Sequence, residues 1–278
     1  MYHIITHNDL DGYSAGYLVN QFLIDVEDVN PNDIAIHIMD YSKELDLNSI
    51  KCFDEVYITD FSLKPDVMNE LLLKTTNVIW LDHHKTALDY LPEYREKVKG
   101  RQIIGMSGTA LTYLYFYAPK EIMDSSIEEM ENWLSKNASK WINLVDAWDC
   151  WKVDSKYRKE SELLSIYMSN RLSVENIKEL DKHGESYLDD ILSKGKIYQE
   201  YKNLSDKSYV ENYGFEIIIK IYDKDQVLHI YRALAVNTGS KGSYVFGSKV
   251  DEYDICIPFV NNGEIIILTV PELTEERR

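Results

Sequence analysis

The stretch NVIWLDHHKTA (Asn77–Ala87) joins a short apolar run to one aspartate and two adjacent histidines. The run Val78–Asp82 is rich in large apolar residues, which is typical of a buried β-strand. Adjacent side chains on a strand point to opposite faces, so at least one of His83 and His84 must turn inward where this strand ends. A buried imidazole needs a polar partner, and the rest of the chain must supply it.

Other short β-rich runs occupy the first part of the chain, at residues 2–6, 34–39, 55–60 and 101–105. Helical patterns of apolar residues follow the first and the third of these runs. Strands this apolar that alternate with helices are typical of a parallel sheet covered on both faces. We therefore predict an α/β fold, with a parallel sheet and flanking helices.

The pattern becomes mostly helical from residue 107 to about residue 204. Residues 109–118 are expected to form one helix and residues 127–151 a single long one. A charged helical stretch follows, in which Gly184 and Gly195 are expected breaks. After Asp206, β-rich runs separated by turn sequences predict a smaller, mostly β domain.

This organisation predicts three parts along the 278 residues. They are a catalytic domain at residues 1–183, a helical linker at 184–207 and a small substrate-binding C-terminal domain at 208–278.

The charge balance restricts the partners, because 47 acidic residues face 30 basic ones and the net charge is −17. Proteins that bind long duplexes usually offer basic surfaces, so a long duplex is not expected as a partner. An anionic substrate would need local positive charge, which metal ions held by carboxylates can supply.

The cysteines and the N-terminus indicate the compartment. Three scattered cysteines without a CxxC spacing argue against a disulfide framework and suit a reducing cytosol. The N-terminus resembles no signal peptide, and no apolar run approaches the roughly 18 residues that a membrane span needs. We therefore expect a cytoplasmic protein without membrane contact.

Polar residues end three of the predicted strands: His7, Asp9 and Asp11 end the first, Asp60 ends the third, and Asp82–His84 end the fourth. In an open parallel sheet, ligands bind outside the carboxyl ends of the strands. The spacing of His7, Asp9 and Asp11 lets three ligand side chains fan along one side of an extended segment. The sequence therefore predicts a site of carboxylates and imidazoles at this sheet edge.

Four segments in order carry a family resemblance: THNDLDG (6–12), ITDFS (58–62), LDHHKTA (81–87) and VDAWDCW (145–151). They resemble the four motifs of the DHH phosphoesterase superfamily. The first motif is most similar to the NrnB-like branch of oligoribonucleases and cyclic-nucleotide phosphodiesterases, and it is also similar to RecJ exonucleases. The resemblance is strong over residues 1–152, and the C-terminal domain would then be a short DHHA1-like domain. The glycine-rich GGGH-type motif usual in that domain is absent from the sequence.

The resemblance implies two metal ions, usually Mn²⁺, with Mg²⁺ or Co²⁺ as substitutes. The ligands that it implies are His7, Asp9, Asp11, Asp60, His83 and an aspartate of the fourth motif, with Asp60 bridging. Asp146 and Asp149 are both candidates for that last ligand, and we favour Asp146. His84 would face the substrate phosphate as a catalytic residue, and Asp82 would orient an imidazole.

Substrate contacts are expected at two places. Ser107 and Thr109 stand at a helix start, where an N-cap is the simpler interpretation and a phosphate contact the alternative. In the small domain the candidates are Arg232, Asn237, Ser240 and Lys241, although a plain turn is an equal interpretation of GSKGS.

The resemblance implies a Mn²⁺-dependent phosphodiesterase that hydrolyses short oligoribonucleotides or cyclic (di)nucleotides. Two alternatives stay open: a nucleotide-signal binding protein without turnover, and a RecJ-like single-strand exonuclease. The expected partner is a short oligonucleotide or cyclic nucleotide, and a homodimer is compatible with the sequence.

Overall fold

The computed structural model describes residues 1–94, 98–223, 226–238, 243–261 and 266–268. The chain divides into two compact units, Met1–Lys196 and Ile197–Arg278. The division falls inside residues 184–207, which the sequence analysis assigns to a helical linker. Within the described ranges, no helix has the length and apolar character needed to cross a membrane.

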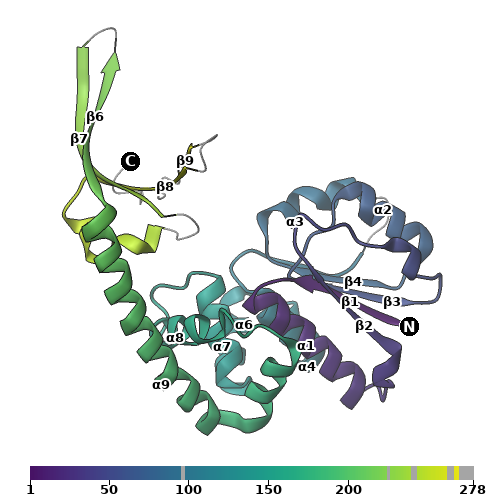
Figure 1. Cartoon of the computed structure of the whole chain (residues 1–278). Helices are drawn as coiled ribbons and strands as arrows, with labels where there is room; N and C mark the ends of the chain where they lie inside the picture. The colour runs from purple at the N-terminus through teal and green to yellow at the C-terminus, as the bar shows by residue number, and fades with distance from the viewer. Residues whose placement is uncertain (95–97, 224–225, 239–242, 262–265, 269–278) are drawn as a thin grey trace. The chain divides into compact units, whose positions relative to one another are not determined.

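The first unit contains a parallel five-stranded sheet in the order β2-β1-β3-β4-β5 (Figure 1). Its strands are β1 (Tyr2–His7), β2 (Ile34–Met39), β3 (Glu55–Thr59), β4 (Val78–Asp82) and β5 (Lys99–Gln102). Its main helices are α1 (Leu10–Asp25), α2 (Pro65–Lys74), α3 (Lys85–Tyr90), α4 (Gly108–Tyr117), α5 (Lys120–Met123), α6 (Ile127–Asn137), α7 (Lys140–Asp149) and α8 (Arg158–Met168). The predicted α/β class with a parallel sheet is confirmed.

Both faces of this sheet are buried, as the unbroken apolar strands require. Adjacent Ile4 and Ile5 are both inaccessible to solvent, and they belong to different apolar clusters. Ile5 packs with residues of α2, such as Met68, whereas Ile4 packs with Val19 of α1. Helices therefore cover both faces of the sheet, and the ends of its strands are not covered by them.

The order of the strands indicates where a ligand-binding site should lie. The chain leaves β1 to form β2 on one side and then returns to form β3 on the other. Strand order thus reverses at β1, and ligands of open α/β sheets bind at such a reversal, outside the carboxyl ends. His7 is the last residue of β1 and Asp60 directly follows β3, the two strands that flank this point.

The single long helix predicted for residues 127–151 is wrong, because the structure has two. The helix α6 ends at Asn137, and Ala138 takes an extended backbone before α7 begins at Lys140. The break lets both helices turn apolar side chains, among them Met130 and Leu144, onto the same core. Packing onto that core outweighs continuous helical hydrogen bonding.

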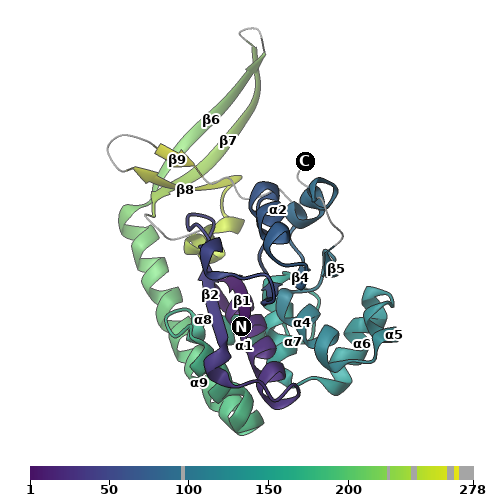
Figure 2. The same ribbon diagram turned by 90° about the vertical axis from the view of Figure 1, so that its right-hand side faces the viewer.

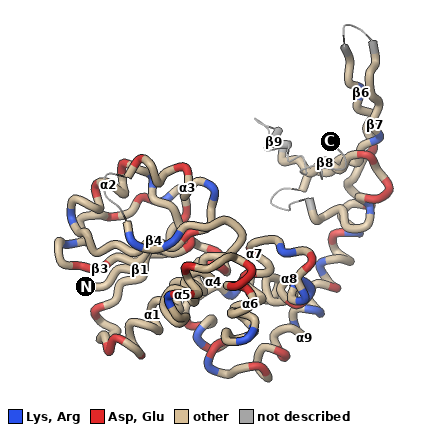
Figure 3. The backbone as a smooth tube through the Cα atoms, turned by 180° about the vertical axis from the view of Figure 1, so that it is seen from behind, with Lys and Arg blue, Asp and Glu red and all other residues tan. Residues whose placement is uncertain are grey.

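The helix α9 (Val174–Tyr213) begins in the first unit and continues into the second. Gly184 interrupts it with a φ of 65°, whereas the helix continues through Gly195. A Cβ atom on Gly195 would lie 2.3 Å from the carbonyl oxygen of Leu163, so the glycine permits close approach of α8. Acidic and basic residues are interspersed along α9 (Figure 3).

The second unit adds a smaller sheet in the order β6-β7-β8-β9 (Figure 2). Its described strands are β6 (Phe215–Asp223), β7 (Gln226–Asn237), β8 (Ile255–Asn261) and β9 (Ile266–Leu268). The β6–β7 and β8–β9 pairs are antiparallel, and β7 and β8 are parallel. The prediction of a smaller, mostly β C-terminal part is confirmed.

Candidate metal centre

The parallel register brings three strand ends together. Thr6 of β1 is paired with Thr59 of β3, and Thr59 with Leu81 of β4. The residues that follow, His7, Asp60 and Asp82, therefore emerge at one edge of the sheet.

Asp60 lies at the centre of this edge and is 1% exposed. Its φ of 52° is in the left-handed region, where a non-glycine residue is strained. Its Oδ1 lies 3.1 Å from His83 Nε2, and its buried Oδ2 has no hydrogen-bond partner in the described residues. Burial, followed by the charges of Asp11 and Asp9, raises the pKa of this carboxyl well above its usual value. A buried carboxylate oxygen without a partner among other carboxylates fits a bound cation.

The N-terminus of α4 holds a second carboxylate in place. Asp11 Oδ2 accepts from the Gly108 N–H at 2.6 Å, and Oδ1 accepts from the Thr109 N–H at 2.8 Å. A Cβ atom on Gly108 would lie 2.4 Å from the Cβ atom of Asp60, so this position requires glycine. Burial raises the pKa of Asp11 to about 6 despite these hydrogen bonds.

His83 lies among three carboxylates. Its Nε2 is 3.1 Å from Asp60 Oδ1, 3.1 Å from Asp149 Oδ2 and 3.6 Å from Asp11 Oδ2. Its Nδ1 lies 4.0 Å from the sulfur of Cys150. Burial alone would lower the pKa of His83, but hydrogen bonds to Asp149 and Cys150 and the charge of Asp11 raise it to about 11. A proton on this ring thus supplies positive charge that the carboxylates otherwise lack.

A separate pair occupies the end of β1. His7 Nδ1 lies 2.7 Å from Asp9 Oδ2, and the other Asp9 oxygen accepts from the Gly12 N–H at the start of α1. The hydrogen bond to Asp9 raises the pKa of His7.

Among the residues that the structure describes, three overlapping groups have ligand atoms within 4.8 Å of one another. They are His7, Asp9 and Asp60; Asp60, His83 and His84; and His83, Asp149 and Cys150. Asp60 and His83 each belong to two of the groups, so the residues present fit two neighbouring cations that share Asp60. Carboxylate oxygens mixed with imidazole nitrogens suit Mn²⁺-like ions.

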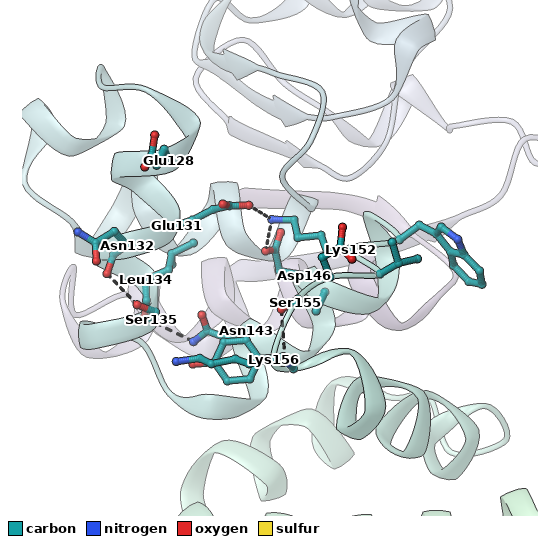
Figure 4. A pocket seen from close by; sticks show the side chains of 15 residues that line it. Glu128, Glu131, Asn132, Leu134, Ser135, Asn143, Asp146, Lys152, Ser155 and Lys156 are labelled. Atoms are coloured by element: carbon teal, nitrogen blue, oxygen red, sulfur yellow. Dashed lines mark hydrogen bonds and ion pairs between the residues drawn. The ribbon is translucent and has the colours of Figure 1, made fainter. Parts of the chain in front are cut away.

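The structure does not support the preference for Asp146 over Asp149. Asp146 is buried, and its Oδ1 accepts from the Ser107 N–H at 2.9 Å. Its Oδ2 accepts from Lys152 Nζ at 2.6 Å (Figure 4). Asp149 instead contacts His83. The spacing of three residues puts both aspartates toward one face of α7, but Lys152 neutralises Asp146 and leaves Asp149 for the cluster.

Ser107 and Thr109 do not offer the alternative phosphate contact. Both are inaccessible to solvent, and their N–H groups already donate to Asp146 and Asp11. The Ser107 hydroxyl accepts from the Ala110 N–H, so it is the N-cap of α4. These residues position two carboxylates rather than a substrate.

His84 and Asp82 form a pair beside the cluster. The His84 side chain is one-third exposed, and its Nδ1 lies 2.8 Å from Asp82 Oδ1. Burial alone would raise the pKa of Asp82, but its hydrogen bonds with His84 and Ser62 lower it below the usual value. Asp82 is fully buried, so it can act on a substrate only through His84.

The predicted contacts of the small domain lie in the second unit. Arg232 donates to Glu216 at 2.7 Å and stacks on the ring of Tyr253, and the Asn237 carbonyl accepts from Tyr209. Ser240 and Lys241 lie outside the described residues.

Cys150, Lys152 and Tyr41 also lie at or beside the cluster, although their place there was not expected from the sequence. Cys150 and Lys152 lie in or directly after the fourth motif, so their place in the chain was an available signal. Tyr41 follows β2, and its ring centroid lies 5.6 Å from that of His7. It also stacks on Phe61 at 5.0 Å, which places an aromatic surface beside the cluster.

Lys152→Met is expected to lower the free energy of unfolding by about 3–5 kcal/mol, because it leaves the buried Asp146 carboxylate without its cation. The two side chains are only 18% and 9% exposed. Urea denaturation measures the loss.

The matched control is Lys140→Met, whose ion pair with Glu160 is more exposed at 29% and 39%. We expect it to cost less than about 1 kcal/mol. Equal losses in the two variants would show that the Asp146 pair has no special importance.

Metal binding should raise the melting temperature, by about 5 °C or more for Mn²⁺ well above its Kd. Without metal, the raised pKa of Asp11 stabilises the fold at low pH, and that stability is lost as pH rises from about 4 through about 6. The raised pKa of Asp60 acts in the same direction. The raised pKa of His83 adds stability below 6.5 that is lost as pH rises toward about 11.

The Mn²⁺-induced rise in melting temperature should therefore be larger at pH 8 than at pH 6, because metal displaces protons from these groups. Scanning calorimetry with EDTA and with Mn²⁺ at both pH values measures it. Identical curves with and without metal would contradict a formed site.

The chain is similar to known proteins both in sequence and in fold. No family model matches the chain. The oligoribonuclease NrnB of Bacillus subtilis (strain 168) is 26% identical over 204 residues, which cover 70% of this chain and 49% of that protein. The chain thus spans about half the length of the curated relative that it matches. The DHH domain of a member of the S1p family of ribosomal proteins matches with a TM-score of 0.54 at 13% identity, over 98% of this chain and 74% of that one.

An uncharacterised protein from Helicobacter pylori G27 has a TM-score of 0.46 at 14% identity, over 98% of this chain and 86% of that one. The resemblance that the four motifs indicated is confirmed by the first relative and by the fold of the DHH domain.

Proposed function

We propose that this chain, which resembles the DHH phosphoesterase superfamily and its NrnB branch, is a metal-dependent phosphodiesterase that acts on short oligoribonucleotides or cyclic dinucleotides. The observation that carries the proposal is the buried Asp60 carboxylate, whose Oδ2 has no partner in the described residues and which belongs to two ligand groups. A carboxylate shared in this way suits a bridge between two ions.

The residues would divide between two ions. His7 and Asp9 would hold one, Asp11, His83 and Asp149 the other, and Asp60 would bridge them. When bound, two such ions supply Lewis-acid chemistry, which neutralises a phosphodiester and acidifies the attacking water. Mn²⁺ fits the oxygen and imidazole donors, and Mg²⁺ or Co²⁺ could substitute.

His84 would transfer a proton to the leaving group. Its Nδ1 is bonded to Asp82, whose lowered pKa keeps that carboxylate ionised. An ionised partner fixes the tautomer with hydrogen on Nδ1. Nε2 is then the ring atom that exchanges a proton with a phosphoryl or leaving oxygen.

The aromatic surface beside the cluster supports a nucleotide substrate over a simple phosphate ester. Tyr41 is 57% exposed, stacks on the buried Phe61 and lies next to His7. Aromatic side chains bind bases by stacking without sequence preference, at about 1–3 kcal/mol per base. A base adjacent to the scissile phosphate would therefore find a stacking partner here.

The negative net charge of the molecule favours short substrates over long polynucleotides. With a net charge of −17, long-range attraction to a polynucleotide is weak, and two ions neutralise few phosphates. We expect kcat/KM in Mn²⁺ to be higher for di- to pentaribonucleotides or cyclic dinucleotides than for long single strands, and duplex DNA to be resistant. Chromatography of a labelled length series at fixed salt measures these values.

The Asp60→Asn variant, prepared in parallel, controls for contaminating nucleases. A kcat/KM that rises steadily with length would favour a RecJ-like exonuclease. Tight binding of the same oligonucleotides without turnover would favour the nucleotide-binding protein.

A further inference from the structure

The strand β6 has a free edge in the described part of the small sheet, where β7 pairs with it on one side only. β8 pairs with residues 233–237 of β7, so the outer part of the β6–β7 hairpin is a ribbon of two strands. Both faces of this ribbon carry exposed apolar side chains, such as Ile218 and Ile230 on one face and Ile221 on the other. A two-stranded ribbon is marginally stable alone, and a long apolar edge is a template for another strand.

The sequence of β6, FEIIIKIYD, is self-complementary in one antiparallel register. If Ile218 faces Ile218 of a second copy, Glu216 faces Lys220 on both sides of the two-fold axis. Phe215 then faces Ile221, and Ile217 faces Ile219. Every residue from 215 to 221 thus meets an apolar or oppositely charged partner, and such cross-strand pairs stabilise sheets.

Competing registers are worse. A shift of the register by one residue would set side chains from opposite faces of the two sheets across from each other, because side chains alternate along a strand. A slip of two residues leaves Glu216 and Lys220 opposite apolar side chains. A slip of four residues sets Glu216 against Glu216, or Lys220 against Lys220, and directly opposed like charges are destabilising.

The acidic member of the charge pair is held in place. Glu216 accepts from Arg232 at 2.7 Å and from the Tyr253 hydroxyl at 2.6 Å, both on its own chain. These hydrogen bonds lower the pKa of Glu216 to about 2, so it stays charged. Its fixed position reduces the conformational entropy lost when Lys220 of a second copy approaches.

We propose that two copies of this chain associate through antiparallel pairing of their β6 strands about Ile218, which joins their small sheets into one. We identify the partner as a second copy because, in one register, the charged and apolar side chains of β6 match those of another β6 strand. The inference does not depend on the proposed catalytic function.

A charge-swap experiment on the whole chain tests the pairing, with Kd measured by sedimentation velocity. Lys220→Glu alone sets Glu against Glu, and Glu216→Lys alone sets Lys against Lys, so each homodimer should weaken at least about tenfold. An equimolar mixture of the two variants restores both opposite-charge pairs. The mixture should therefore dimerise at least about tenfold more tightly than either variant alone, whereas equal Kd values for the mixture and the single variants, with both variants folded by circular dichroism, overturn the register.

Cross-linking provides a second measurement that does not alter the charges. In a Cys52→Ser background, Ile218→Cys should form a disulfide-linked dimer under copper–phenanthroline oxidation, because the position faces itself. The matched variant Ile221→Cys, which faces Phe215, should not. Equal cross-linking of both variants, or a monomer at every concentration of the unmodified chain, would refute the proposal.

A further control separates strand pairing from general stickiness of the hairpin. Ile218→Asp should abolish the dimer, whereas Leu228→Asp, a 55% exposed residue on β7, should leave it within about threefold. Equal loss in both variants would point to non-specific association instead.

Discussion

Asp60→Asn is expected to lower kcat/KM by a factor of about 10³ or more, because the variant loses the carboxylate shared by both ligand groups. Asparagine is chosen because it has nearly the same shape and tolerates the left-handed backbone at φ 52° better than alanine does. A loss of activity in this variant is therefore separable from a loss of fold.

The same variant carries a second signature. Removing a buried carboxylate whose pKa is raised by its surroundings relieves repulsion with Asp11 and Asp9, so the metal-free protein should melt at a higher temperature. Mn²⁺ should no longer raise that temperature. Calorimetry and turnover of a diribonucleotide measure the two effects.

Asp40→Asn is the matched control, since Asp40 follows the neighbouring strand β2 but makes its contacts with Ser42 and Lys43. It should retain both activity and the metal response. Near-normal turnover in Asp60→Asn would refute the two-ion site.

Asp149→Asn is expected to remove one of two bound ions and to lower kcat/KM by a factor of about 10². Its Oδ2 lies 3.1 Å from His83 Nε2, at the group assigned to the second ion. Asp146→Asn should retain both ions, because that side chain is bonded to Lys152 and to the start of α4. It should mainly lower the free energy of unfolding.

Elemental analysis after equilibrium dialysis against Mn²⁺ gives the ions per chain, and kinetics on the same samples gives activity. Both variants replace an aspartate by asparagine, at positions three residues apart on α7. If Asp146→Asn loses an ion and Asp149→Asn does not, the ligand assignment is reversed.

The sequence determined the fold class and the edge of the sheet that carries the site. Apolar strands report their burial locally, and the polar residues after β1, β3 and β4 stand next to those strands in the chain. Because parallel strands align their carboxyl ends, local sequence was enough to bring His7, Asp60 and His83 together.

Only the tertiary structure decided which neighbours each carboxylate has. Lys152 folds back onto Asp146, and α4 directs its N–H groups at Asp11 and Asp146, so Asp149 is left to contact His83. The contacts of α4 with Asp11 and Asp146, and that of Asp149 with His83, join segments far apart in the chain, whereas spacing in a sequence reveals only a local face. The break between α6 and α7 has the same origin, since the shape of a shared core decides where a helix must turn.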